Sequence, residues 1–429
     1  SQLLEHIKSY NPEMQIIAVG DMQQKIYDKT SLDVSEFIVH FIGEHIQLVD
    51  ERNKGLKVKQ LLGLSISKQF IPSVANIIGT DMENYKIIRK NQFACSTMQV
   101  RRDKKMPVAL LQEVDEAIIS QAYPIFEVKN DKELLPEYLM MWFTRSEFDR
   151  EACFHAVGGV RGSLEWEDFE NLQLPIPSIT KQREIVKEYN VIQNRIALNQ
   201  QLIQKLEEIA QAIYREWFVE GIDLENLPEG WRVGKIGDLL DVINGYAFSS
   251  EDFSENGNFP IIKITNIAEP NIDLLSTQYY AGEIDNRLKK CLVTQNDILI
   301  SMTGSHMNQI NSAVGKIGRY NYQFPSLLNQ RVGKLKPKFK CDEFVFLTML
   351  QQNVKKEILM AATGSANQAN ISPDTIKGVD IIIPNETILH SFENFVSKVR
   401  KVISNHNREI RKLTQMKDLL LSKLATIEN

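Results

Sequence analysis

Two stretches of the chain carry the same long pattern of apolar and polar positions. In residues 185–217 apolar residues recur at alternating steps of four and three, and residues 392–424 repeat this spacing 207 positions later. Such steps keep one stripe of a helix apolar and are typical of a left-handed coiled coil. Neither run contains Pro or Gly, the residues that interrupt helices. The pattern therefore predicts two long helices, at 180–218 and 386–426.

We expect these two helices to pair with each other in antiparallel orientation, which brings Asn199 near His406. A polar residue in such a seam fixes the register at some cost in stability. The alternative is a pair of ordinary amphipathic helices on a globular core, but those seldom keep a strict 3.5-residue period for so long. The predicted seam consists of Ile192, Ile196, Asn199, Ile203, Leu206, Val399, Ile403, His406, Ile410 and Leu413.

The repeat extends beyond the helices into the strand-rich stretches that precede them. Each stretch closes with a loop, a short helix and a strand ending in Pro, at 158–177 and 363–384, and Asn91-Gln92-Phe93 matches Asn296-Asp297-Ile298. A repeat of this length indicates duplicated units. We therefore predict an α+β fold with two similar strand-rich domains separated by the two long helices, in a pseudo-two-fold arrangement. The boundaries are an N-terminal extension of uncertain role (1–41), a first domain (42–179), a first helix (180–218), a linker (219–230), a second domain (231–385) and a second helix (386–426).

Composition places the chain among ordinary globular proteins. Hydrophobic residues make up 43% of the chain and charged residues 24%. Its length of 429 residues is enough for two or three domains. No stretch approaches the ~20 apolar residues of a membrane span, and the first residues lack a signal-peptide pattern. The four cysteines form no CxxC pair, which favours a reducing cytosol and argues against a structural zinc or disulfide framework. We expect a cytoplasmic protein.

No catalytic motif stands out. The chain has no GxxxxGK[ST], no Pro-Pro of a DNA amino-methyltransferase motif, no HExxH and no GxSxG. Residues 16–28, IIAVGDMQQKIYD, resemble a segment of superfamily I helicases, but the phosphate loop is missing. A nucleotide-driven helicase or nuclease component is thus one hypothesis, and a non-catalytic binding protein that holds no metal or cofactor is favoured over it.

The net charge is −5, so any nucleic-acid surface must be local. Lys334, Lys336, Lys338 and Lys340 alternate along an expected strand, which would place four ammonium groups on one side. Two other basic clusters lie at 101–105 and 287–290. On charge alone, the favoured alternative is a set of lysines that protects an exposed sheet edge.

Several loops are rich in side chains that can read base edges. Asn and Gln can bond adenine with two hydrogen bonds and Arg can bond guanine, at about 1–3 kcal/mol of discrimination per pair. The alternative is that Ser, Asn and Gly occur there because they tolerate turns. The candidate DNA-binding residues are Ser96, Thr97, Gln99, Arg101, Arg102, Lys104, Arg161, Ser301, Thr303, Ser305, Asn308, Asn329, Gln330, Arg331, Ser365, Asn367, Gln368 and Asn370.

Taken together, residues 42–426 resemble the DNA-specificity subunit of type I restriction–modification complexes. The resemblance rests on the two closing segments that each run into a long helix, on LPEGWRVGKIGDLL, and on FPIIKITNI, NDILISMTG and NQRVGKLKP. It implies that each globular domain reads one half of a split double-stranded DNA sequence while the helices set the spacing. It also implies partners: two methyltransferase subunits using S-adenosylmethionine, and restriction (motor and nuclease) subunits using ATP and magnesium. The alternative is a protein–protein scaffold with a helicase-derived N-terminal fragment.

Overall fold

The computed structural model describes residues 38–73, 80–158, 162–275, 277–305, 312–365 and 368–425. The chain divides into two compact units, Ser1–Val186 with Leu421–Asn429, and Lys187–Leu420. The helicase-like stretch at 16–28 lies outside the described residues. Within the described part of the chain, no helix is both long and apolar enough to cross a membrane.

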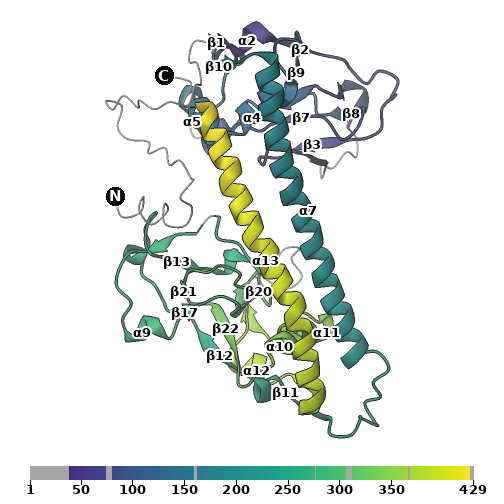
Figure 1. Cartoon of the computed structure of the whole chain (residues 1–429), viewed down its shortest axis with the longest axis vertical. Helices are drawn as coiled ribbons and strands as arrows, with labels where there is room; N and C mark the ends of the chain where they lie inside the picture. The colour runs from purple at the N-terminus through teal and green to yellow at the C-terminus, as the bar shows by residue number, and fades with distance from the viewer. Residues whose placement is uncertain are drawn as a thin grey trace. The chain divides into compact units, whose positions relative to one another are not determined.

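The two predicted long helices are α7 (Ile179–Phe218) and α13 (Glu386–Ala425), each of 40 residues and thus roughly 60 Å long. They lie side by side in the second unit (Figure 1). Arg195 pairs with Glu409 at 2.7 Å, and the Trp217 and Phe392 rings are 5.7 Å apart. Because residue numbers rise along one helix as they fall along the other, the pair is antiparallel, as predicted.

The polar contact in the seam has the predicted register. His406 Nδ1 donates to Asn199 Oδ1 at 2.9 Å, which requires the imidazole proton on Nδ1. All ten predicted seam residues are buried or half-buried, and Ile403 has no exposed surface. The hydrophobic seam and its polar pair thus follow directly from the heptad pattern.

The first domain is mostly β-strand. Its elements are β1 (Ile38–Phe41), α2 (Ile42–His45), β2 (Ile46–Val49), β3 (Leu62–Leu64), β4 (Phe70–Pro72), η2 (Met82–Asn84), β5 (Lys86–Arg89), β6 (Phe93–Cys95), α3 (Val100–Asp103), β7 (Val108–Leu110), β8 (Glu116–Ile119), β9 (Ile125–Val128), α4 (Pro136–Thr144), α5 (Ser146–His155), α6 (Trp166–Glu170) and β10 (Gln173–Ile176). Its central sheet has the order β2-β9-β6-β7, with every neighbouring pair antiparallel.

The second domain has the same plan with additions. Its elements are β11 (Arg232–Lys235), α8 (Ile236–Leu239), β12 (Leu240–Asn244), η3 (Ser250–Asp252), β13 (Phe259–Ile262), η4 (Ile264–Asn266), β14 (Ile267–Ala268), β15 (Asn271–Ile272), β16 (Tyr279–Tyr280), α9 (Asn286–Lys289), β17 (Leu292–Val293), β18 (Ile298–Ser301), β19 (Thr303–Gly304), β20 (Ile317–Arg319), β21 (Ser326–Leu328), β22 (Val332–Pro337), α10 (Asp342–Met349), α11 (Gln352–Met360), β23 (Thr363–Ser365), β24 (Gln368–Asn370), α12 (Pro373–Lys377) and β25 (Asp380–Ile383). The central sheet is β12-β22-β18-β20, extended by β15 and β14.

The two central sheets correspond strand by strand, in chain order and in sheet order. The matched residues Asn91 and Asn296 both adopt a left-handed backbone, with φ of 69° and 75°. The Asn91 N–H donates to Leu111 O at 2.9 Å and the Asn296 N–H to Tyr320 O at 2.8 Å. Asn tolerates this conformation better than most residues, so the same turn enters β6 and β18. The predicted similarity of the two domains is confirmed.

The folded part of the first domain begins earlier than the sequence suggested. Ile38–Phe41, which we placed in the N-terminal extension, forms β1 and pairs antiparallel with β10. The second domain pairs β11 with β25 in the same way. Both closing strands therefore gain hydrogen bonds from a strand at the start of their own domain, which the weak pattern around Ile38 did not reveal.

Candidate nucleic-acid interface

Three of the predicted DNA-reading loops of the second domain meet at the end of β18. The Met302 N–H donates to Arg331 O at 2.8 Å, and the Ile371 N–H donates to Met302 O at 2.9 Å. Backbone hydrogen bonds thus bring the segment after β18, the turn between β21 and β22, and the closing segment together. In addition β19, β24 and β23 form one small antiparallel sheet. We call the assembly of 301–305, 329–331, 363–365 and 368–371 the second loop cluster.

Two of the predicted residues hold this cluster together from inside. Ser301 has no exposed surface and donates through Oγ to Thr303 O at 3.0 Å. Thr303, 7% exposed, donates through Oγ1 to Asn370 Oδ1 at 2.9 Å. The expectation that Ser301 and Thr303 face DNA does not fit their burial. Their hydroxyl groups satisfy polar partners that would otherwise be buried without one.

Of the predicted residues in the second loop cluster whose side chains the structure describes, Gln330 and Arg331 are exposed. Asn329 is half-buried, and its Oδ1 accepts the Gln330 N–H at 2.8 Å. Arg331 has a φ of 72°, so the tight turn directs its backbone carbonyl to Met302. Among the described residues its guanidinium has no hydrogen-bond partner, which leaves its donors available.

The other predicted residues of this cluster are placed less fully. Ser305 is half-buried, and its carbonyl accepts a hydrogen bond from Ser312 Oγ at 2.5 Å. Asn308 and Asn367 lie outside the described residues, and Ser365 and Gln368 are described by backbone only, in β23 and β24.

The first domain has an equivalent cluster. The Leu164 N–H donates to Thr97 O at 2.9 Å, and these residues match Ile371 and Met302 of the second domain. Val157 and Ser163 exchange two backbone hydrogen bonds of 3.0 Å. In the second domain, β23 and β24 form the corresponding antiparallel pair. We call residues 96–105 with 157–158 and 162–164 the first loop cluster.

Basic side chains are exposed in the first loop cluster. Arg101 is exposed; its N–H donates to Gly162 O at 3.3 Å and its Nη1 to Gly158 O at 3.4 Å. Arg102 is exposed and paired with Asp103 at 2.6 Å, and this hydrogen bond lowers the pKa of Asp103. Lys104 is exposed with a φ of 51°.

The remaining predicted residues of the first domain are less accessible. Ser96, Thr97 and Gln99 are half-buried, and Arg161 lies outside the described residues. Gly162 is a positioning residue that sequence reasoning treated only as part of a turn. A Cβ there would lie 2.9 Å from Arg101 Cβ, so only glycine permits this approach. The Gly-rich run at 158–162 was the available signal.

The predicted row of four lysines is not a single row. β22 ends at Pro337, so Lys338 and Lys340 lie beyond the strand. Lys334 is half-buried and pairs with Asp297 at 3.3 Å. The end of the strand breaks the alternation on which the prediction rested. Arg287 of the other cluster pairs with Asp285 at 2.8 Å.

Comparison with known proteins agrees with this arrangement. A family model for the type I restriction modification DNA specificity domain matches residues 74–208 and 228–415, most of the chain. The HindI specificity subunit of Haemophilus influenzae is 21% identical over 427 residues, covering 83% of this chain and 90% of that protein. The MjaVIII specificity subunit of Methanocaldococcus jannaschii is 23% identical, covering 60% of this chain and 62% of that protein.

A solved structure has the same fold. The S subunit of a type I restriction–modification system from M. genitalium superposes with a TM-score of 0.53 at 16% identity, covering 90% of this chain and 96% of that one. The duplicated domains and paired helices define a type I specificity fold. The chain belongs to the type I restriction–modification DNA-specificity family.

Proposed function

We propose that the chain is the sequence-reading subunit of a type I restriction–modification complex, with each domain reading one half of a two-part DNA target. The observation that carries the proposal is the duplicated hydrogen bond, Leu164 to Thr97 and Ile371 to Met302, because it builds the same loop cluster in both domains. One molecule with two like readers matches a target with two separated halves. The two clusters differ in side chains, so the two half-sites need not have the same sequence.

Within each cluster we assign different tasks to different groups. The exposed Arg101, Arg102 and Lys104 would contact phosphates and position the first domain, since phosphate contacts fix register but carry little sequence information. Gln330 and Arg331 would contact base edges, where Gln pairs with adenine and Arg with guanine. Each base pair read in this way contributes about 1–3 kcal/mol of discrimination.

A footprint of the assembled complex with its methyltransferase subunits on a library of random duplexes tests the proposal. We expect two protected blocks with an unread spacer between them. Arg331→Ala should relax selection at one position of one block and leave the other block unchanged. A single continuous block, or relaxation of both blocks by Arg331→Ala, would contradict two independent readers.

The paired helices are proposed to set the distance between half-sites. Because seven residues make one seam repeat, an insertion of seven residues near Ile203 in α7 and near Ile403 in α13 preserves the seam. It lengthens the pair by about 10 Å, or roughly three base pairs of B-DNA at 3.4 Å each. We expect the spacer to grow by that amount. A seven-residue insertion in the linker at 219–230 is the control. An unchanged spacer in the variant with both helix insertions would exclude the helix pair as the element that sets the spacing.

The outer surface of α7 supports docking of the methyltransferase subunits on the helix pair. Val191, Leu198, Leu202 and Ile209 are 62%, 46%, 40% and 49% exposed. Their spacing of seven, four and seven places them on one stripe next to the seam. An exposed apolar stripe at heptad spacing is the surface that a partner helix buries.

Replacement of the central residue of this stripe tests the docking surface. Leu202→Glu should weaken assembly with the methyltransferase subunits by tenfold or more, whereas Gln201→Glu, at the exposed neighbouring position, should not. Analytical ultracentrifugation of the mixture measures both. Equal assembly of the two variants would place the docking surface elsewhere.

We further propose that S-adenosylmethionine, ATP and magnesium act in the methyltransferase and restriction subunits, and that this chain contributes no catalytic group. The purified chain alone should neither transfer methyl groups nor hydrolyse ATP, and photo-crosslinking of labelled S-adenosylmethionine to the complex should label the partner subunit. Labelling of this chain would contradict the assignment.

A further inference from the structure

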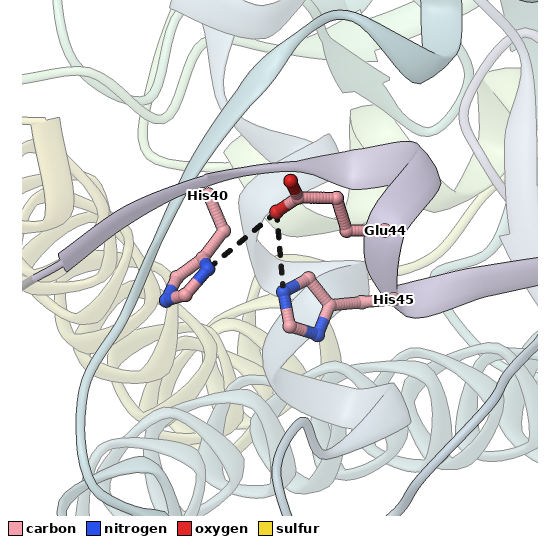
Figure 2. Close-up of side chains that lie close together, drawn as sticks. All are labelled: His40, Glu44 and His45. Atoms are coloured by element: carbon pink, nitrogen blue, oxygen red, sulfur yellow. Dashed lines mark ion pairs between the residues drawn. The ribbon is translucent and has the colours of Figure 1, made fainter.

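Three side chains with metal-binding chemistry converge at the start of the first domain (Figure 2). His40 comes from β1, whereas Glu44 and His45 come from α2. One ligand atom from each residue lies within 4.8 Å of the other two. His40 Nδ1 is 3.6 Å and His45 Nε2 is 4.0 Å from the same oxygen, Glu44 Oε2.

These separations are too long for hydrogen bonds and lie at the outer range of an ion pair between a carboxylate and a protonated imidazole. N–H···O bonds in proteins span about 2.7–3.2 Å, so neither imidazole is bonded to the carboxylate. His45 Nε2 is buried and has no hydrogen-bond partner. A buried ring nitrogen without a partner costs free energy, and this one faces the Glu44 carboxylate (Figure 2).

We propose that His40, Glu44 and His45 bind one divalent transition-metal ion, of which Zn²⁺ is the representative. Two imidazole nitrogens and one carboxylate oxygen suit Zn²⁺, Co²⁺ or Ni²⁺, whereas Mg²⁺ and Ca²⁺ prefer oxygen ligands alone. Zinc bonds of about 2.0–2.2 Å in a tetrahedron place ligand atoms roughly 3.3–3.5 Å apart. The ligand atoms lie up to 4.8 Å apart, so they need to close by up to about 1.5 Å. The two imidazoles must move as well as the 55% exposed side chain of Glu44.

Bound metal would join the first strand to the helix that follows it. β1 is the strand that pairs with β10, which leads directly into α7. A metal bound by one ligand from β1 and two from α2 would therefore hold β1, the partner strand of β10, against α2. Lys129 Nζ donates to Gly43 O at 2.9 Å and to Glu44 O at 3.0 Å, so a neighbouring positive charge limits the affinity. Ligand binding to the folded state alone raises the unfolding temperature.

Titration of the full-length chain without a polyhistidine tag tests the site. Co²⁺ should bind with one equivalent and give the visible absorption of low-coordinate cobalt, and Zn²⁺ should displace it. Glu44→Gln, at an exposed side chain, should weaken Zn²⁺ binding at least about tenfold in calorimetry, as should His40→Ala and His45→Ala. His390→Ala, at an exposed histidine of α13, should bind as the unaltered chain does.

The melting temperature provides a second readout. Zn²⁺ should raise it in the unaltered chain and in His390→Ala, and should raise it less in Glu44→Gln at the same Zn²⁺ concentration. Stoichiometric binding that survives both Glu44→Gln and His45→Ala would overturn the proposal, because the ion would then sit elsewhere. Binding that needs millimolar Zn²⁺ would also overturn the proposal. The three residues would then form only long contacts between a carboxylate and two imidazoles.

Discussion

The two domains place a helix against a long helix in the same way but use different chemistry at the contact. In the first domain the Leu135 N–H, at the start of α4, donates to Gln182 Oε1 of α7 at 2.9 Å. In the second, the Phe344 N–H, at the start of α10, donates to Glu393 Oε1 of α13 at 2.7 Å. The first N–H groups of a helix lack an internal acceptor. A neutral amide supplies one in the first domain and a carboxylate in the second.

Around Glu393 the second domain buries a network of charges. Glu343 of α10 accepts two hydrogen bonds from Arg319 of β20, at 2.9 and 3.0 Å, and lies 3.5 Å from Arg400 of α13. All four residues are at most 6% exposed. The network therefore connects the central sheet, α10 and α13 within one unit.

The first domain buries its ion pair elsewhere. Lys68 and Asp149 lie 2.8 Å apart and connect a turn to α5, not to a long helix. Burial lowers the pKa of Lys68, and Asp149 partly opposes this shift. Gln182 instead donates through Nε2 to Glu133 O at 2.7 Å and to Pro177 O at 2.8 Å. The comparison shows that the geometry of the duplicated contact is common to both domains, while each satisfies it with its own polar groups.

Replacing Glu343 should have the largest effect, because two buried arginines lose their acceptor. We expect Glu343→Gln to lower the free energy of unfolding by about 3–5 kcal/mol. Calorimetry of the full chain measures it, with Asp380→Asn as control. Asp380 pairs with Lys235 at 2.7 Å, but both side chains are more than half exposed, so its loss should cost at most ~1 kcal/mol. Equal effects of the two substitutions would show that the network contributes nothing beyond a surface pair.

Asp149→Asn is the matching change in the first domain. One cation loses its partner instead of two, and Asn can still accept the Met106 N–H that Asp149 Oδ1 accepts at 3.1 Å. We expect a loss of about 2–3 kcal/mol, measured by urea unfolding. A loss as large as that of Glu343→Gln would mean that the number of buried cations does not set the cost.

Gln182→Glu transfers the chemistry of the second domain to the first. The new carboxylate can accept the Leu135 N–H, but it would face the carbonyls of Glu133 and Pro177, which lose their donor. We expect destabilisation by about 1–3 kcal/mol, checked by thermal melting. If the variant is as stable as the unaltered chain, an amide and a carboxylate are interchangeable at this contact. The two domains would then not require different polar groups there.

Glu393→Gln is the reverse exchange and should change the pH dependence most. Burial raises the pKa of Glu393 from 4.5 to about 7. The folded state therefore keeps a proton that the unfolded state releases, so stability present below pH ~4.5 is lost as pH rises through ~7. Asp342 and Glu343 contribute to the shift. As pH rises from 5 to 8, the free energy of unfolding of Glu393→Gln should increase by roughly 1–3 kcal/mol relative to that of the unaltered chain. Parallel stability curves for the two proteins would contradict the raised pKa.

Much of the fold could be predicted from spacing alone. A strict 3.5-residue period predicted the helix pair, and it placed Asn199 opposite His406 because seam positions alternate regularly along both helices. The sequence matched Asn91 to Asn296, and the structure shows the same turn at both positions. The sequence named the loops that carry candidate polar groups, but a loop sequence does not say which side chains become buried. Ser301 and Thr303 have the same chemistry as exposed hydroxyl residues, and only the packing of 301–305 against the closing segment shows that they lie inside.

The amino-acid sequence by itself determined the number of domains, the length and pairing of the helices, and the loops that carry polar groups. The reason is that the period of apolar residues and the internal repeat depend only on the order of residues. The tertiary structure decided which of those polar groups face solvent. It also decided that β1 pairs with β10 and that Arg319 meets Glu343 and Arg400. These contacts join residues from different segments of the chain. Burial and ion pairing depend on distances in space that no local pattern encodes.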